Sequence, residues 1–352
     1  MRHLQHARIT TVTLSLIALA TVIACYGCSG PVPASAPGLQ KVTMGIQVSP
    51  AMTTVMVAKD AGLFEKHGLD VELKEFTAGK FALQAFLTSS IDFAVSGEVP
   101  VALAALQGND LRVVAQVVEA TTNEVRVVAR RDASTSPAQY FSKAKRKLAT
   151  SFGGGPEFFT YSFLRHYKIN DAQVEILSQR PEDMAAALDS GSVDAIAIFD
   201  PFAFVAERRL GDKAVTFTDS SLYSELYVLN ARPDYIERQP EVIDRVLRAI
   251  VDASDMIERD PASAKQIVQR YTKLEDDVVN GIWSNFVFRP ALTSQLLQFW
   301  EAEAQWARAT NKITPNSPAV NFRSLIEPRF LRAIKPEAVR LDAPVQVSSA
   351  TP

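Results

Sequence analysis

The segment VTMGIQVSPAMTTVMVAKDAGLFEKHGLDVELKEF, from Val42 to Phe76, decides the fold class of this chain. Its alternating and apolar residues predict a strand over 42–48, a short helix over 52–61 that ends at Gly62, and a second strand over 69–76. A strand, a helix and a strand in this order favour parallel pairing through a right-handed crossover. The segment therefore predicts an α/β fold.

The same pattern continues along the chain in two blocks. The first block is completed by further predicted helices and strands at 80–88, 93–95, 99–106, 113–118 and 125–129. The second begins near Arg130 and has predicted strands and helices at 147–150, 157–167, 174–177, 181–189 and 195–199. After Leu229 the chain is predicted to be almost wholly helical, at 240–259, 262–271, 276–286 and 292–309. Two blocks of this kind predict two α/β lobes.

Composition agrees with a globular protein. The chain has 352 residues, of which 47% are hydrophobic and 22% charged, so it can bury a sizeable core and is long enough for two domains. The formal net charge of -2 provides no basic surface of the kind that binds nucleic acid. We therefore expect no nucleic-acid partner.

The N-terminal sequence is typical of an exported lipoprotein. Arg2 and Arg8 precede an apolar run over 9–24, which ends in Val-Ile-Ala before Cys25. We predict a signal peptide over 1–24, a lipid on Cys25, and a flexible tether over 25–40 that is rich in Pro, Ala, Ser and Gly. An ordinary signal or membrane anchor with incidental cysteines is the alternative, and Cys28 is the alternative lipid site.

Cysteine and histidine usage limits the possible chemistry. Both cysteines, Cys25 and Cys28, lie in the predicted leader region, so the globular part has no disulfide framework, thiolate metal site or cysteine nucleophile. Beyond the predicted leader the histidines are His67 and His166, both expected on helix surfaces. We therefore expect no metal, no cofactor and no enzymatic activity.

Several short motifs together resemble one protein family. The first-lobe motifs are AKDAGLFE (58–65), GLDVE (68–72), SIDFA (90–94) and LRVVA (111–115). The second-lobe motifs are KLATSFGGG (147–155), PEDMAAAL (181–188), VDA (193–195) and Asp200-Pro201. Their order over residues 41–320 resembles periplasmic solute-binding proteins of the nitrate/sulfonate/taurine class of ABC importers. One departure is SKAKR (142–146), where the family commonly has Leu-Lys-Gly-Lys, in a loop outside the expected cleft.

The resemblance implies a type II periplasmic-binding-protein clamp: two lobes, each a mainly parallel sheet with flanking helices, and a helical C-terminal region. We place the two crossings between lobes near 127–129 and 227–229. The resulting division is lobe I over 41–128 and 229–340, lobe II over 129–228, and a tail over 341–352.

Candidate ligand-binding residues lie in turns that follow strands. In open α/β lobes, ligands bind beyond the carboxyl ends of strands, where helix N-termini present backbone N–H groups. The turns of the first lobe supply Gln47, Ser49, Pro50, Lys80, Phe81, Ser96, Gly97 and Glu98. The second lobe supplies Ser151, Gly153, Gly154, Glu157, Phe158 and Asp200.

Each of these residues also has a purely structural explanation. Ser49-Pro50 is an ordinary helix start, Lys80 can be a solvated lysine, and Glu157 can complement a helix dipole. Asp200 can belong to a turn beside the hinge. Glu98 does not fit an anion site, because its carboxylate would repel an anion. Either Glu98 points away from the site, or the ligand carries a hydrogen-bond donor or a positive group.

The resemblance therefore implies an extracytoplasmic substrate-binding component of an ABC importer. It would be a monomer, lipid-anchored in the periplasm or cell envelope, that captures a small anionic or zwitterionic organic solute, aromatic or not, for a permease and its ATPase. Two alternatives stay open. One is an enzyme on the same scaffold, although the related pyrimidine-forming family relies on a cysteine-rich segment and a histidine that this chain does not match. The other is a sensor that binds the same class of ligand.

Overall fold

The computed structural model describes residues 38–121, 124–219, 221–314, 317 and 319–342. The predicted signal peptide, Cys25, Cys28 and most of the predicted tether and tail lie outside these ranges. Within them, no helix combines the length and apolar character needed to cross a membrane.

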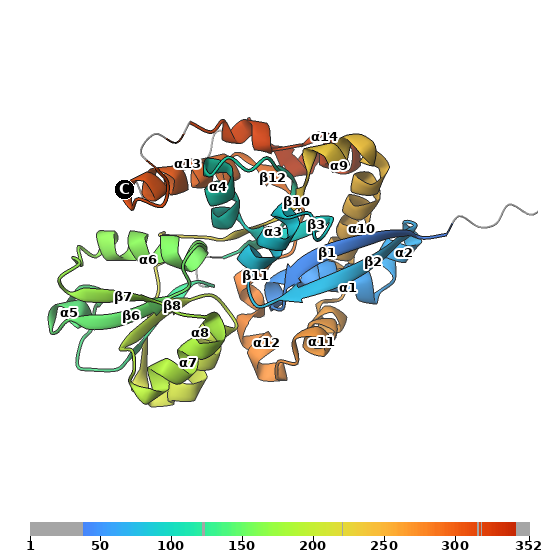
Figure 1. Ribbon diagram of the computed structural model, residues 1–352. Coiled ribbons are helices and arrows are strands. Elements are labelled where there is room, and N and C mark those ends of the chain that lie inside the picture. The colour runs from blue at the N-terminus through green and yellow to red at the C-terminus, as the bar shows by residue number, and fades with distance from the viewer. Residues whose placement is uncertain (1–37, 122–123, 220, 315–316, 318, 343–352) are drawn as a thin grey trace, which may run out of the picture. The chain divides into compact units, whose positions relative to one another are not determined.

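A six-stranded mixed sheet forms the centre of lobe I (Figure 1). Its strands, in spatial order, are β11 (Phe286–Val287), β4 (Arg112–Ala120), β10 (Leu226–Ala231), β3 (Phe93–Gly97), β1 (Gln40–Gln47) and β2 (Leu69–Phe76). β1 pairs in parallel with β2 and β3, whereas β10 runs antiparallel to β3 and β4, and β11 antiparallel to β4. The parallel β1–β2 pair with its intervening helix is the unit that the opening sequence segment predicts.

Helices from both halves of the chain pack on this sheet. Those before the first crossing are α1 (Thr53–Asp60), α2 (Leu63–Lys66), α3 (Gly79–Leu87) and α4 (Glu98–Leu106). Those after the return are α9 (Pro233–Arg238), α10 (Pro240–Arg259), α11 (Pro261–Thr272), α12 (Asp276–Ile282), α13 (Ser294–Ala309) and α14 (Arg329–Ile334). α10 packs against α1 and α2, and α13 packs against α4. The C-terminal helices are therefore an integral part of lobe I.

A five-stranded mixed sheet forms lobe II. Its strands, in spatial order, are β7 (Val174–Ser178), β6 (Arg146–Thr150), β8 (Ala195–Ile198), β5 (Arg126–Arg130) and β9 (Ala214–Phe217). Its helices are α5 (Pro137–Ser142), α6 (Gly155–His166), α7 (Pro181–Ser190) and α8 (Phe202–Leu210). α6 covers one face of this sheet, and α7 and α8 lie together on the other (Figure 1).

Short elements complete the chain. They are the 3-10 turns η1 (Pro50–Met52), η2 (Gly211–Lys213), η3 (Trp283–Asn285), η4 (Phe322–Leu325) and η5 (Pro336–Ala338), and the two-stranded pair β12 (Leu292–Thr293) and β13 (Val339–Arg340).

The two sheets are mixed rather than mainly parallel, because the strands next to the crossings run back against their neighbours. The chain leaves the six-stranded sheet after Ala120 and enters the other sheet at Arg126 with β5, which is antiparallel to β8 and β9. It returns between Phe217 and Leu226. The crossing points predicted from sequence, 127–129 and 227–229, thus lie inside β5 and β10, a few residues into the sheet that receives the chain.

Local sequence signals explain the element boundaries. α10 begins with Pro240 at its first turn and buries an apolar stripe that includes Val242, Val246 and Ile250. α7 ends at Gly191, whose φ of 78° is the left-handed conformation that glycine adopts without strain. These signals predicted both helices to within one residue.

Candidate functional site

Three turns at the carboxyl ends of β1, β2 and β3 lie together. The side-chain oxygen of Gln47 accepts a hydrogen bond from the amide of Gly79 at 3.0 Å, and its Nε2 donates to Ser49 Oγ at 2.8 Å. A Cβ atom on Gly79 would lie 3.0 Å from Cα of Ser96, so glycine allows the third turn to approach this closely. Gln47, Ser49 and Ser96 are therefore brought to one edge of the lobe I sheet, and all three are buried.

Lys80 reaches from lobe I to lobe II. Its Nζ donates to Ser151 Oγ at 3.0 Å and to the carbonyl oxygen of Phe152 at 2.6 Å. Burial lowers the pKa of Lys80, although the charge of Glu157 acts in the opposite direction. The ammonium group thus contacts the first turn of lobe II instead of facing an open anion site.

The glycine-rich turn before α6 is held by its own glutamate. Gly153 has a φ of 78°, and its amide donates to Glu157 Oε2 at 2.7 Å. The other carboxylate oxygen of Glu157 pairs with Lys312. Gly154 then forms the residue before the helix in extended conformation. Glu157 accordingly stabilises the turn, and its charge is paired with that of Lys312.

The remaining predicted residues of these turns pack against the core or against aromatic rings. Pro50 opens η1 and is buried, and Phe81 is half-buried against the core. The ring of Phe158 contacts Tyr223 and Trp306 edge-on, with centroid separations of 5.7 and 5.5 Å. Phe158 thereby contributes to an aromatic wall.

Glu225, which the sequence did not single out, lies between the glycine turns of the two lobes. A Cβ atom on Gly97, the residue that precedes α4, would lie 2.2 Å from Oε1 of Glu225. A Cβ atom on Gly155, the first residue of α6, would lie 2.8 Å from Oε2 of the same carboxylate. Alanine at either position would collide with it. The Glu225 carboxylate is therefore placed against the N-terminal ends of α4 and α6 together.

Glu98 is fully buried beside Glu225. Its two oxygens accept hydrogen bonds from the Tyr223 hydroxyl at 2.6 Å and from the Leu226 amide at 2.7 Å. Burial raises the pKa of the Glu98 carboxyl to about 7, and these hydrogen bonds oppose the rise. Glu98 thus points into the protein, where its carboxyl group accepts hydrogen bonds from the chain itself.

Three further buried carboxyl groups share this region. Glu225 Oε2 and Glu124 Oε2 have no hydrogen-bond partner among the described residues, and the oxygens of Glu303 meet only the carboxyl group of Glu98 there. Burial raises the pKa of all three well above the ordinary range, and the nearby carboxylates raise them further. The carboxyl groups of Glu98 and Glu303, on the packed helices α4 and α13, hydrogen-bond to each other, and this contact raises the pKa of Glu303 but lowers that of Glu98. We call Glu98, Glu225 and Glu303 the carboxylate cluster.

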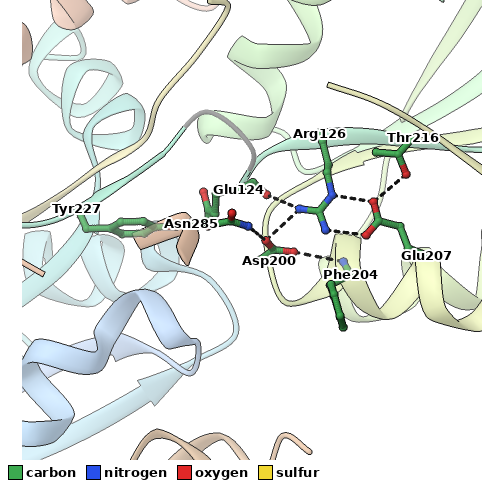
Figure 2. A network of polar contacts seen from close by, with 8 residues as sticks. All are labelled: Glu124, Arg126, Asp200, Phe204, Glu207, Thr216, Tyr227 and Asn285. Carbon is green, nitrogen blue, oxygen red and sulfur yellow. Dashed lines mark hydrogen bonds and ion pairs between the residues drawn. The ribbon is translucent and has the colours of Figure 1, made fainter. Parts of the chain in front are cut away.

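A second polar network, at the crossings, centres on the guanidinium group of Arg126 (Figure 2). Arg126 donates through Nη1 to Asp200 at 2.9 Å and through Nε and Nη2 to the two oxygens of Glu207, both at 2.8 Å. Asp200 also accepts from Asn285 Nδ2 at 2.8 Å and from the amide of Phe204 at 3.2 Å. The predicted ligand residue Asp200 therefore has its oxygens occupied by partners within the chain, and through Asn285 it ties lobe II to lobe I.

The carboxylate cluster left weak signals in the sequence. Glu303 occupies the same helix face as the buried residues Leu296, Trp300 and Ala307, so a charge stands at core spacing. Glu225 immediately precedes β10, and Tyr227 and Asn230 place polar groups within this buried strand. A buried charge at core spacing is a functional signal that periodicity could have supplied. Its partner from the distant α4 is a tertiary contact that no local pattern predicts.

The described cavities lie elsewhere on the molecule. One of about 320 Å³ is lined by residues that include Gln116, Arg289 and Arg340, and another of about 600 Å³ by residues that include Lys41 and Tyr271. Neither includes a residue of the carboxylate cluster, and the convergence of turns from two lobes is the stronger indication of a site. Within the described ranges, no group of three His, Cys, Asp or Glu side chains is arranged to hold a metal ion.

Comparison with known proteins identifies related chains. A model of the NMT1-like family matches residues 35–272. A putative aliphatic sulfonates-binding protein of Bacillus subtilis is 24% identical over 276 residues, covering 77% of this chain and 81% of the relative. The taurine-binding periplasmic protein of Escherichia coli is 25% identical over 217 residues, covering 60% and 65%. The alkanesulfonate-binding protein SsuA of Xanthomonas axonopodis pv. citri, bound to MOPS, is similar in structure with a TM-score of 0.69 and 21% identity, covering 83% of this chain and 100% of that one. The fold is therefore that of periplasmic binding proteins.

Proposed function

Because the chain belongs to the NMT1-like family, we propose that it is the extracytoplasmic substrate-binding component of an ABC importer. In this role it captures a small organic solute between its two lobes and presents it to a permease with its ATPase. It acts by binding and release, without chemical change of the solute. The names of its relatives, which include sulfonate- and taurine-binding proteins, support this role.

The observation that carries the proposal is the convergence of turns from both lobes on one set of buried polar groups. Lys80 of lobe I contacts Ser151 of lobe II, and Gly97 and Gly155 both pack against Glu225. Glu225 belongs to the segment through which the chain returns to lobe I. A solute bound at this point contacts lobe I, lobe II and a crossing segment at once.

Such an arrangement favours coupling between binding and closure. A ligand that contacts both lobes binds the closed form more tightly, and about 5.5 kcal/mol of differential affinity would move the population from 1:99 to 99:1. A few charge-assisted hydrogen bonds formed only in the closed form suffice for this difference.

Thermal shift with a panel of small solutes tests the role. The panel contains ethanesulfonate, taurine, benzenesulfonate, benzylamine and benzamidine, and we expect at least one to raise the Tm of the wild-type protein. Gly155→Ala should abolish that shift, because its Cβ collides with Glu225 and with the Tyr223 hydroxyl at 2.4 Å.

A matched control is Gly45→Ala. Its Cβ would meet Ile91 Cδ1 at 2.5 Å inside lobe I, so it should lower the Tm but keep the ligand-induced shift. A wild-type protein that responds to no member of the panel, or a Gly155→Ala variant that keeps the full shift, would contradict the proposed role.

We further propose that the protein is exported, anchored to a membrane of the cell envelope by a lipid on Cys25, and monomeric. The leader-like sequence over 9–24 and the periplasmic relative support export. Metabolic labelling with a palmitate analogue should be lost in Cys25→Ser and retained in Cys28→Ser; the reverse pattern would move the lipid to Cys28.

A further inference from the structure

The carboxylate cluster stands where the two lobes meet. Glu98 is the first residue of α4, Glu225 lies on the return crossing, and Glu303 projects from α13. Glu225 marks the junction, because its two oxygens lie against Gly97 of lobe I and Gly155 of lobe II. The cluster therefore belongs to the proposed solute site.

Unused hydrogen-bonding capacity remains in this cluster. Oε2 of Glu225 lacks a hydrogen-bond partner within the described chain, and the oxygens of Glu303 meet no group there other than the carboxyl of Glu98; the two residues are only 6% and 0% exposed. A buried carboxylate oxygen without a donor costs free energy, and native proteins satisfy nearly all such groups. These buried acceptor atoms, which no N–H or hydroxyl donor of the described chain meets, point to a ligand that supplies donors.

Nearby cations of the chain are engaged elsewhere. Lys312 pairs with Glu157, and Lys80 contacts Ser151 and the Phe152 carbonyl. The neighbouring charges that most affect Glu225 are all carboxylates. The cluster thus carries an excess of acidic groups over cations.

Aromatic rings border the same junction. Tyr223, which donates to Glu98, contacts the rings of Phe158 and Phe299 at centroid separations of 5.7 and 6.5 Å. Phe158 in turn contacts Trp306. Aromatic faces attract organic cations, an effect that a small metal ion held by oxygen ligands does not require.

We propose that the site selects an organic cation, a small amine or amidine whose N–H groups donate to Glu225 and Glu303, with Glu98 as a neighbouring carboxyl group. This inference rests on the proposed function and names its substrate class. When the lobes open, the unpartnered oxygens become accessible, and the cation takes them up as the lobes close around it. The positive charge then compensates the excess of carboxylates.

The same geometry disfavours a sulfonate. Backbone amides and helix dipoles at the N-terminal ends of α4 and α6 would suit an anion, but the Glu225 carboxylate already lies against both ends. A sulfonate there would be a further anion beside Glu98 and Glu303. The site therefore differs in charge from that of the sulfonate-binding relatives.

Matched pairs of opposite charge test the substrate class at pH 7.5. The probes are benzylamine and benzamidine against benzenesulfonate, putrescine against ethane-1,2-disulfonate, and CaCl₂ and MgCl₂. We expect one or more organic cations to raise the Tm by several degrees, and we expect the sulfonates and divalent metals to leave it unchanged. Calorimetric titration then gives the affinity for the most effective cation.

Glu303→Gln separates a ligand-binding role from a structural one. It replaces a buried carboxyl group, whose raised pKa destabilises the fold at pH 7.5, by an amide of the same shape, so we expect a higher Tm without ligand and at least tenfold weaker binding of that cation. Glu301→Gln, an identical change at an exposed position on the same helix, should alter neither quantity. Glu225→Gln provides a second variant with the same expected loss of affinity should the first fail to fold.

The outcomes distinguish the two proposals. Sulfonates or divalent metals that raise the Tm while organic cations do not would overturn the substrate class and leave the binding role intact. No response to any probe would overturn both. Wild-type affinity for the cation in Glu303→Gln and Glu225→Gln would also overturn the assignment of the cluster.

Discussion

The Arg126 network and the carboxylate cluster both bury acidic side chains at the junction of the lobes, yet they differ in their counterions. Asp200 and Glu207 share one guanidinium group, and their remaining acceptors meet Asn285 or Thr216. In the carboxylate cluster, hydroxyl and amide donors meet Glu98, whereas among the described residues Glu225 Oε2 has no partner and Glu303 meets only the Glu98 carboxyl group. The comparison indicates that the paired network stabilises the fold, whereas the unpaired cluster is arranged for a ligand.

Arg126→Ala should produce the largest loss of stability. The variant leaves the buried Asp200 and the partly buried Glu207 without their cation, and loss of the partner of a buried charge typically costs about 3–5 kcal/mol. Denaturant unfolding followed by circular dichroism measures the effect. Arg208→Ala is the control, because its pairs with Glu275 and Asp277 are exposed and should contribute about 0–1 kcal/mol.

A large loss of stability in Arg126→Ala but not in Arg208→Ala would show that the buried network stabilises the fold. Equal, small losses for Arg126→Ala and Arg208→Ala would show that the buried network does not stabilise the fold, and the contrast between the two regions would fail.

The carboxylate cluster should make the free energy of unfolding fall as the pH rises. Burial raises the pKa of Glu98 to about 7, so the folded state holds its proton above the ordinary pKa of the unfolded chain. The contribution of Glu98 is therefore complete below about pH 4.5 and is lost as the pH rises through about 7, by up to ~3 kcal/mol. Glu225 and Glu303 act in the same direction.

The free energy of unfolding of the unliganded protein, measured from pH 5 to pH 8, should accordingly fall. Carboxyl groups with lowered pKa values, such as Glu207 and Asp219, act in a more acidic range and do not reverse this slope. Glu98→Gln should flatten the profile, since the amide side chain that it introduces cannot ionise. A free energy of unfolding that stays level or rises from pH 5 to pH 8 in the wild-type protein would contradict the raised pKa values of the cluster.

Sequence patterns predicted most of the fold because its elements carry local signals. The strand over 69–76 and the helix over 240–259 appear with the predicted bounds, since alternation, apolar stripes and terminal Gly or Pro mark them. The helix α8, right after Asp200-Pro201, was missed, because Phe202, Val205 and Arg208 give it no strong apolar stripe. The crossings predicted at 127–129 and 227–229 lie within β5 and β10, where buried apolar residues such as Val127 and Leu229 give no local sign of which sheet they join.

The candidate site could be predicted only in part. Turns such as Ser96-Gly97 and Ser151–Gly155 were accessible to reasoning because strand ends before helices are visible in the sequence. Glu225 and Glu303 were not, because their role depends on contacts between segments far apart in the chain. The doubt that Glu98 raised about an anionic ligand was the one sequence clue to the charge of the site.

Proton release on binding tests the central claim most directly. An organic cation that pairs with the carboxylate cluster favours its ionised form, so at pH 6.5 binding should release protons to the solvent. Calorimetry of the most effective cationic probe in two buffers with different ionisation enthalpies counts these protons. We expect release in the wild-type protein and less release in Glu98→Gln. Proton uptake, or binding with no proton exchange at any pH between 5 and 8, would contradict the account.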